Sequence, residues 1–204
     1  MSRITSVAVL QTRMVNELTG CPQALMVQAL MDAARDFCTD SEAWQEELEP
    51  IDIVEAQLEY DLAPEYDAHI KRLIWVKLNT EDGVTNDVDP TPLDERLYEL
   101  RLGDPEVLVL DDSLEPTEDI TDALTVKAVL VPEFNSLDIA EWFLNRYWKG
   151  IVGKAMHSRM MDPNKRWTNP TRAAMYYQQY MDELQNAGME VTRQHKNDRS
   201  EMPA

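Results

Sequence analysis

The chain has 204 residues, 44% of them apolar and 28% charged, which matches an average soluble domain and excludes a collagen-like, low-complexity or wholly disordered chain. Its 38 acidic side chains outnumber the 19 basic ones and leave a formal charge of −19, which argues against general nucleic-acid binding. No window approaches the ~18 uninterrupted apolar residues of a membrane span, and the N-terminus lacks the order of a secretory signal, so we expect a soluble protein that binds no membrane.

Residues 1–48 predict two N-terminal helices. Apolar residues recur at helical spacing over residues 4–18, and Gly20 follows as a natural stop. Pro22 then opens a second helix, in which every fourth residue from Leu25 to Phe37 is apolar. We expect this helix to end between residues 39 and 44. An acidic stretch and a proline then break the pattern.

Two cysteines, Cys21 and Cys38, flank the second helix. At ~1.5 Å rise per residue a continuous helix separates them by roughly 25 Å, far beyond the ~7 Å limit between the Cα atoms of a disulfide. We therefore expect two buried free thiols and a reducing compartment, such as the cytoplasm of the cell that makes the chain.

Residues 49–132 predict a small antiparallel β module of about four or five strands. Residues 54–62 alternate between apolar and polar side chains, as in a half-buried strand, and residues 70–78 are a denser, more central run. A loop rich in Gly, Asn, Asp and Pro spans residues 79–92. Further short apolar runs follow at residues 97–102, 107–110 and 124–131.

Residues 133–188 predict two C-terminal helices. Asn135 and Ser136 are candidate caps for the first, whose broad apolar face extends from Ile139 to Met156. Asn169 and Pro170 start the second.

The second of these helices is expected to stop near Gly188, leaving residues 189–204 as a loose tail. The order helices, sheet, helices predicts one α+β domain over residues 1–204, in which N- and C-terminal helices form a bundle with the β module inserted.

No catalytic signature is present. The sequence contains no phosphate loop, nucleophile elbow or paired Cys-x-x-Cys. His69, His157 and His195 lack the i, i+4 spacing of helical metal ligands, and the acidic loop at residues 81–89 departs from the calcium-binding pattern. We therefore expect no metal, no cofactor and no enzymatic activity.

Acidic residues are concentrated in the first two thirds of the chain. Residues 1–140 hold 9 basic and 31 acidic residues, a charge of −22, whereas residues 141–204 hold 10 and 7, a charge of +3. Such blocks are solvated faces or interaction surfaces. Aromatic and arginine side chains gather in the last two predicted helices, and core packing and a subunit interface explain them equally well.

Several runs resemble a known family. They are CPQALMVQALMDAARDFC (residues 21–38), PIDIVEAQLEYDLAP, HIKRLIWVKLN, ALTVKAVLVP and DPNKRWTNP. With Trp44 and the order of elements, they make the chain similar, from about residue 10 to 188, to the head-to-tail adaptor (tubular gatekeeper) proteins of short-tailed bacteriophages. The same pattern fits the head- or tail-completion proteins of long-tailed phages.

The resemblance implies a structural protein of the virion neck. Such proteins form a ring, commonly a dodecamer, that binds the portal protein above and a tail nozzle or tail-completion protein below, while DNA passes through without specific binding. A ring needs two different complementary faces on each subunit. We predict that the subunit or portal interface is formed by Trp142, Tyr147, Trp148, Arg159, Arg166, Trp167, Tyr176, Tyr180, Arg193, Lys196 and Arg199.

Acidic walls in such a channel would repel DNA phosphates and let the duplex slide. The candidate channel-facing residues are Glu55, Glu59, Asp61, Asp87 and Asp89, for each of which a solvated outer face is at least as good an explanation. Two other functions stay open: an acidic regulator, acting as a DNA mimic or assembly chaperone, and a hydrolase with a carboxylate site.

Overall fold

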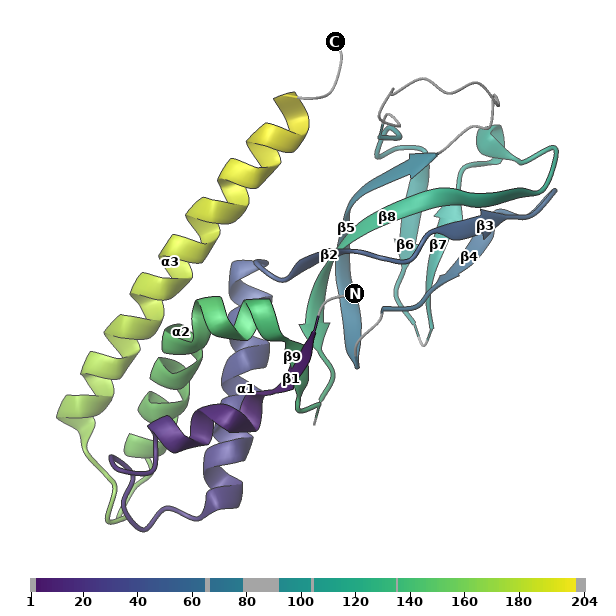
Figure 1. Cartoon of the computed structure of the whole chain (residues 1–204). Helices are drawn as coiled ribbons and strands as arrows, with labels where there is room; N and C mark the ends of the chain where they lie inside the picture. The colour runs from purple at the N-terminus through teal and green to yellow at the C-terminus, as the bar shows by residue number, and fades with distance from the viewer. Residues whose placement is uncertain (1–2, 65–66, 79–91, 104, 135, 201–204) are drawn as a thin grey trace. The chain divides into compact units, whose positions relative to one another are not determined.

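The structure, a computed structural model, describes residues 3–64, 67–78, 92–103, 105–134 and 136–200, with side chains up to Gln194. The chain is mixed α+β, as predicted, with small antiparallel sheets (Figure 1). It divides into two compact units. The helical unit comprises Met1–Trp44, Tyr66–Ala68 and Val131–Lys196, and the strand unit comprises Gln45–Glu65, His69–Leu130 and Asn197–Ala204.

The described residues of the helical unit form three α-helices: α1 (Gln23–Ser41), α2 (Glu141–Met160) and α3 (Pro170–Ser200). The predictions of α1 and α2 as helices are confirmed, because both follow long apolar periodicities. The predicted start of α2 is wrong: Ile139 lies in strand β9 and the helix begins at Glu141. Ser136 accepts the Asp138 N–H at 3.1 Å and does not cap the helix, and Asn135 lies outside the described residues.

Helix α1 ends at Glu42, whose left-handed backbone (φ 54°) directs its N–H to the Cys38 carbonyl at 3.0 Å. Cys21 and Cys38 are both buried and free, as expected.

The first predicted helix is wrong. Residues Ile4–Ser6 form a strand, β1, that pairs antiparallel with β9 (Asp138–Ala140), and Val7–Arg13 follow as a 3-10 helix, η1. Buried Val7 and Leu10 are three residues apart, a spacing that suits a 3-10 helix as well as an α-helix. Ile4 is extended because it pairs with β9. The spacing of apolar residues in the local sequence could not reveal this long-range pairing.

The strand unit is built on β8 (Ile120–Pro132), most of whose side chains are buried. Successive stretches of β8 pair with β2 (Gln45–Glu47) and β3 (Ile51–Ile53), and β8 also pairs with β5 (Ala68–Leu78). A second, antiparallel sheet has the order β4-β7-β6; its strands are Glu59–Leu62 (β4), Glu106–Leu110 (β7) and Tyr98–Arg101 (β6).

Two predictions for these strands are wrong. The alternating run at residues 54–62 is not one strand, since the chain turns between β3 and β4 at Ala56, which has a φ of 60°. The β module also begins before residue 49, since Gln45–Glu47 form β2, whose backbone completes the ladder along β8. In both cases long-range pairing outweighs the local pattern.

Glu106 is a buried carboxylate that joins β7 to β5. Its Oε1 accepts a hydrogen bond from the Ile70 N–H at 3.0 Å. We expect Glu106→Ala to lower the free energy of unfolding by about 1 kcal/mol, because a buried N–H loses its acceptor. Glu106→Gln, which keeps a carbonyl oxygen, should cost less. Urea unfolding of both variants tests this, and equal losses would contradict it.

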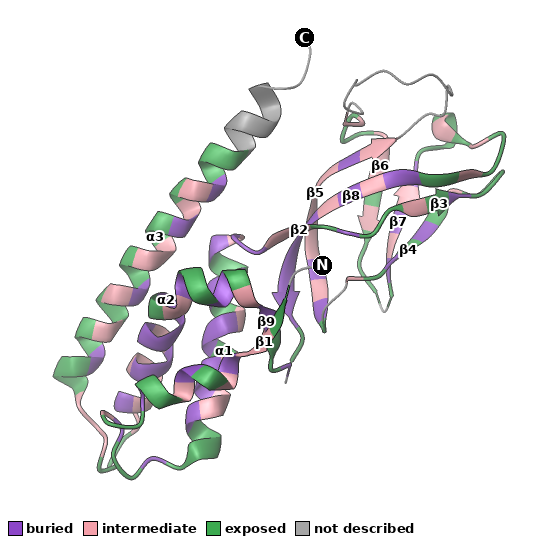
Figure 2. Ribbon diagram, viewed as in Figure 1, coloured by how far each residue is buried: buried purple, intermediate pink, exposed green. Residues whose placement is uncertain are grey.

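Helix α3 is longer than predicted. It continues through Gly188 to Ser200, so residues 189–200 are helical rather than loose. The buried side chains of Ala173, Tyr180, Ala187 and Val191 form one stripe that runs past the glycine, and this stripe holds the helix in place (Figure 2). Asn169 starts α3 as predicted, its Oδ1 accepting the Arg172 N–H at 3.1 Å.

Candidate interaction surfaces

Tyr147 and Tyr180, two of the predicted interface residues, lie inside the helical unit. Their rings lie 5.3 and 6.1 Å from that of Phe37, and both side chains are almost fully buried. The Tyr180 hydroxyl donates to Asp40 Oδ2 at 2.8 Å. Burial, with the nearby carboxylate, raises the pKa of Tyr180. These two side chains therefore pack in the core of the isolated chain.

Other predicted aromatic residues reach the surface of the helical unit. Trp142 keeps 39% of its surface exposed and lies edge-on to Phe143, with 5.6 Å between ring centroids. Trp148 is half-buried, and the Arg13 guanidinium lies 3.8 Å from its ring centroid. Tyr176 is half-buried, and desolvation raises its pKa.

Three predicted residues come together around the turn between α2 and α3, at residues 161–169, which we call the α2–α3 turn. Arg166 and Trp167 lie in it, and Arg159 lies on the last turn of α2. The Arg159 Nη1 is 3.5 Å from Asp162 Oδ2, and the Trp167 Nε1–H donates to the same oxygen at 3.3 Å. One carboxylate, that of Asp162, therefore contacts both a cationic and an aromatic side chain in this turn.

Hydrogen bonds from a side-chain hydroxyl and from the backbone make this turn rigid. The Thr168 hydroxyl donates to the Asp162 carbonyl at 2.5 Å and accepts the Lys165 N–H at 2.9 Å. The Asn169 N–H donates to the Met160 carbonyl at 2.9 Å, and Asn164 adopts a φ of 57° that reverses the chain. The turn thus presents its outer side chains from a fixed backbone.

The outer side chains of the turn are cationic and apolar. Lys165 and Arg166 are exposed, and within the described residues neither has an ion-pair partner. Met161 keeps 50% of its surface exposed. Arginine, methionine and tryptophan are enriched at protein interfaces, and a rigid loop loses little entropy on binding. The turn therefore has the chemistry of a docking surface for an acidic protein partner.

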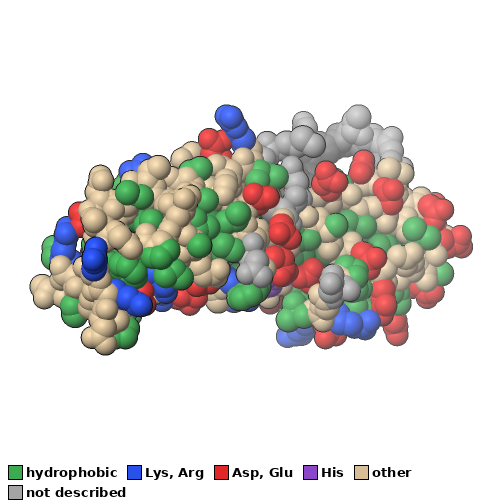
Figure 3. Space-filling model, turned by 90° about the horizontal axis from the view of Figure 1, so that it is seen from below, with side chains coloured by type: hydrophobic (Ala, Val, Ile, Leu, Met, Phe, Trp, Pro, Cys, Tyr) green, Lys and Arg blue, Asp and Glu red, His purple; other side chains and the backbone are tan. Residues whose placement is uncertain are grey.

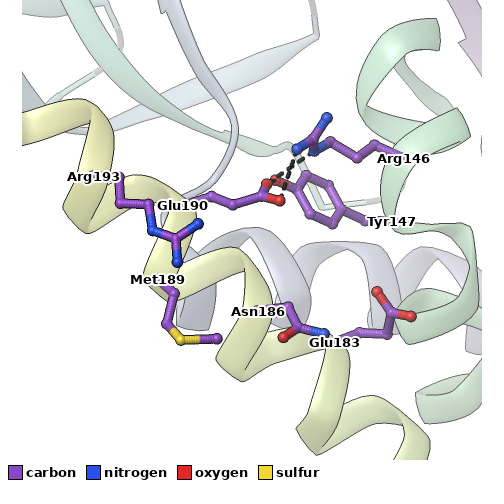
Figure 4. Close-up of a pocket in the computed structure, with 7 residues that line it drawn as sticks. All are labelled: Arg146, Tyr147, Glu183, Asn186, Met189, Glu190 and Arg193. Carbon is purple, nitrogen blue, oxygen red and sulfur yellow. Dashed lines mark hydrogen bonds and ion pairs between the residues drawn. The ribbon is translucent and has the colours of Figure 1, made fainter. Parts of the chain in front are cut away.

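A second feature lies further along α3, where a shallow hollow of about 400 Å³ opens between α2 and α3 (Figure 4). Arg146 makes a bidentate ion pair with Glu190, with nitrogen–oxygen distances of 2.9 and 2.7 Å. The Tyr147 hydroxyl donates to Glu190 Oε2 at 2.8 Å. These bonds attach the C-terminal half of α3 to α2, and Arg193 lines the same hollow.

The charges in this hollow are mutually satisfied. The hydrogen bond from Arg146 lowers the pKa of Glu190, and the carboxylate raises the pKa of Arg146. Burial, followed by the contact with Glu190, raises the pKa of Tyr147 to about 12. A group already paired in this way lacks the free proton acceptor that general-base chemistry needs. The arrangement therefore serves to hold the helices together.

The Glu190 contact predicts a dependence of stability on pH. Because its folded-state pKa is depressed, the carboxylate stabilises the fold above its unfolded pKa of about 4.3, and this stabilisation is lost as the pH falls through the folded-state value. At pH 6 we expect Glu190→Gln to lower the free energy of unfolding by about 0.5–1 kcal/mol, a value reduced for solvent screening. In thermal melts the difference between the two proteins should shrink as the pH falls below about 4. A difference unchanged by pH would contradict this.

The predicted tail residues are only partly described. Arg193 is exposed on α3, whereas Lys196 and Arg199 lie on the helix beyond the last described side chain.

The predicted channel-facing acids lie on different parts of the strand unit. Glu55 is exposed in the turn between β3 and β4, and Asp61 is exposed on β4. Glu59 is exposed but forms an ion pair with Arg101 at 2.8 Å. Asp87 and Asp89, like the rest of the acidic loop, fall outside the described residues.

Negative charge follows the division into two units. Counted on the sequence, the helical unit holds 12 basic and 13 acidic residues, whereas the strand unit holds 7 and 25. In the view of Figure 3 most acidic side chains gather over the strand unit, whereas the helical unit shows a mixture with more basic side chains. The strand unit thus carries a formal charge of −18 and the helical unit −1.

Sequence analysis missed part of these surfaces. Lys165 and Met161 were overlooked, although the polar, cationic run DPNKRWTNP that joins two helices was a signal for them. The acidic residues Glu118 and Asp119 were also overlooked. The hydrogen bond from the Glu55 N–H to Asp119 depends on strand pairing and leaves no trace in the local sequence.

Clusters of three or more possible metal ligands are absent from the described residues. None of the described helices is long and apolar enough to cross a membrane. Searches against protein-family models and against the curated proteins find no match for this chain.

Proposed function

We propose that the chain is a structural subunit of the ring that joins the head of a tailed bacteriophage to its tail. The observation that carries the proposal is the partition of surface chemistry between the two units. A nearly neutral helical unit presents a rigid, cationic and aromatic turn, whereas the strand unit carries a charge of −18. Subunits of a closed ring need two such different faces.

The proposed ring is a dodecamer in the virion neck, bound to the portal protein above and to a tail nozzle or tail-completion protein below. Within each subunit, the three helices would form one bundle. Gly150 and Gly153 of α2 support this arrangement. A Cβ atom at Gly150 would lie 2.6 Å from Phe37 of α1, and one at Gly153 would lie 2.8 Å from the Tyr176 carbonyl oxygen of α3. Both neighbours of α2 therefore pack close to its backbone.

The strand unit would repel DNA during packaging and ejection. Asp61 exposes a carboxylate without a described partner, and such a group next to a duplex repels its phosphates. Repulsion keeps the DNA from adhering to the wall, so no specific contact is required. Glu59 contributes less, because Arg101 neutralises it.

An amber mutation in the gene tests the proposed function. In a non-suppressing host we expect DNA-packaged heads without tails, which lose DNA unless the chain is supplied in trans. Negative-stain microscopy of the particles and plating after complementation measure both outcomes. Normal tailed, infectious particles made without the chain would overturn the proposal.

The charge of the strand unit also favours a second candidate, an acidic regulator that occupies the basic groove of another protein. A regulator predicts a fall in particle number with normal morphology in the same amber experiment. It also predicts that a basic protein co-purifies with the chain at low salt and is released at high salt.

A further inference from the structure

We propose that the α2–α3 turn of one copy binds an acidic tip on the strand unit of a second copy. The acidic tip consists of residues 52–57, which include the end of β3 and the turn after it, and residues 116–122, which include the start of β8 and the segment before it. The inference rests on the proposed function, since it specifies the contact by which copies would join in a ring.

The acidic tip is a fixed structure, although its two segments lie far apart in the sequence. The Glu55 N–H donates to Asp119 Oδ1 at 2.7 Å, and the Ala56 N–H donates to the Pro116 carbonyl at 2.9 Å. On the other side of the tip, the Asp122 N–H donates to Asp52 Oδ1 at 2.8 Å. These bonds tie the two segments together, so the tip needs little ordering on binding.

The tip combines an exposed apolar side chain with carboxylates. Val54 keeps 45% of its surface exposed, directly after buried Ile53. The same two segments carry four exposed acidic side chains: Asp52, Glu55, Glu118 and Asp119. A partner for this surface must therefore combine positive charge with an apolar contact.

The α2–α3 turn supplies that combination. Lys165 and Arg166 are exposed cations without an ion-pair partner among the described residues, and Met161 offers an exposed apolar side chain beside them. Arg172, at the start of α3, is instead engaged by Glu17. Charge complementarity of this kind directs association and sets the register of the interface.

A second copy is the partner that these observations favour. One chain carries both surfaces, and they differ from each other, so the contact is heterologous and repeats from copy to copy. The strand unit, with its charge of −18, repels the strand unit of a neighbour. Pairing the tip with the cationic turn of the next copy reduces this repulsion.

Charge reversal in trans tests the contact. The turn variant carries Lys165→Glu and Arg166→Glu, and the tip variant carries Glu55→Lys and Glu118→Lys. Neither Glu55 nor Glu118 uses its carboxylate in the described hydrogen bonds of the tip. Control variants are Lys149→Glu and the pair Glu95→Lys with Glu99→Lys, all at exposed positions of the same two units.

Mass photometry of the full-length proteins at low salt gives the readout. We expect the wild type and the controls to assemble, and each reversed variant alone to associate at least ~30-fold more weakly, because like charges then face each other. An equimolar mixture of the turn and tip variants should assemble again, since every acidic turn can meet a basic tip. Such rescue requires that both variants are folded.

Three results would overturn the proposal: a wild type that stays monomeric at its highest soluble concentration, reversed variants that assemble like the wild type, or a mixture that is not rescued. Loss of binding to a short DNA duplex in the turn variant, with unchanged assembly, would assign the turn to phosphate instead. Normal assembly of both reversed variants rejects the contact and leaves the proposed function standing. If the mixture assembles but the amber mutant still makes tailed particles, the contact stands and the proposed function is rejected.

Discussion

Replacing Phe37 by alanine is expected to lower the free energy of unfolding by about 3–5 kcal/mol, the usual range for a fully buried phenylalanine. Phe37 of α1 has no exposed surface and lies at the centre of the aromatic cluster of the helical unit. Its ring centroid is 6.1 Å from that of Phe143, 5.3 Å from that of Tyr147 and 6.1 Å from that of Tyr180. The substitution therefore opens a cavity that touches all three helices.

Phe134→Ala is the matched control for this substitution. Phe134 belongs to the same unit but keeps 65% of its surface exposed, with the Arg35 guanidinium 5.6 Å from its ring centroid. Losing this contact should cost at most about 1 kcal/mol. Urea unfolding followed by tryptophan fluorescence measures both variants. Equal losses at the two positions would show that Phe37 does not organise the core.

Gly153→Ala, which adds one methyl group to α2, should have the second largest effect on the free energy of unfolding. The new Cβ would lie 2.8 Å from the Tyr176 carbonyl oxygen and 3.3 Å from the Tyr180 nitrogen, both backbone atoms of α3. Because backbone cannot rotate away, α3 must shift. We expect Gly153→Ala to destabilise the chain by about 2 kcal/mol, despite the gain of ~1 kcal/mol in helix propensity.

Gly188→Ala is the control, and it is expected to raise the free energy of unfolding instead of lowering it. Gly188 lies inside α3, and a Cβ atom there would meet nothing within 4 Å. Only helix propensity changes, so this variant should gain about 0.5–1 kcal/mol. Thermal melts of both alanine variants check the pair. A stabilising Gly153→Ala would mean that α2 and α3 do not approach each other at this glycine.

Helices α1 and α2 could be predicted from the sequence because their apolar residues recur at helical spacing, and strands β5, β7 and β8 because each is a dense apolar run. Strand β1 could not, since Ile4 continues a helical spacing and its extended backbone is set by pairing with Ala140. The end of α3 was misplaced for a related reason. Gly188 is a good local stop, but buried Ala187 and Val191 and the Arg146–Glu190 ion pair extend the helix past it.

The surfaces were predictable in composition but not in geometry. Arg159, Arg166 and Trp167 stood out by residue type, and the structure gathers them around one turn. Their scaffold, built on Asp162 and Thr168, could not be foreseen, because it depends on side-chain to backbone bonds within an irregular segment. Proximity in the acidic tip likewise comes from the pairing of β3 with β8, more than sixty residues away along the chain.

Quantitative mass spectrometry of purified particles tests the central claim most directly. Virions of the phage whose genome encodes the chain are digested with isotope-labelled standards for this chain and for its portal protein. A structural adaptor predicts a fixed copy number equal to one ring for each portal ring, unchanged after washing in high salt. Absence of the chain from particles, or a variable trace that salt removes, would contradict the account.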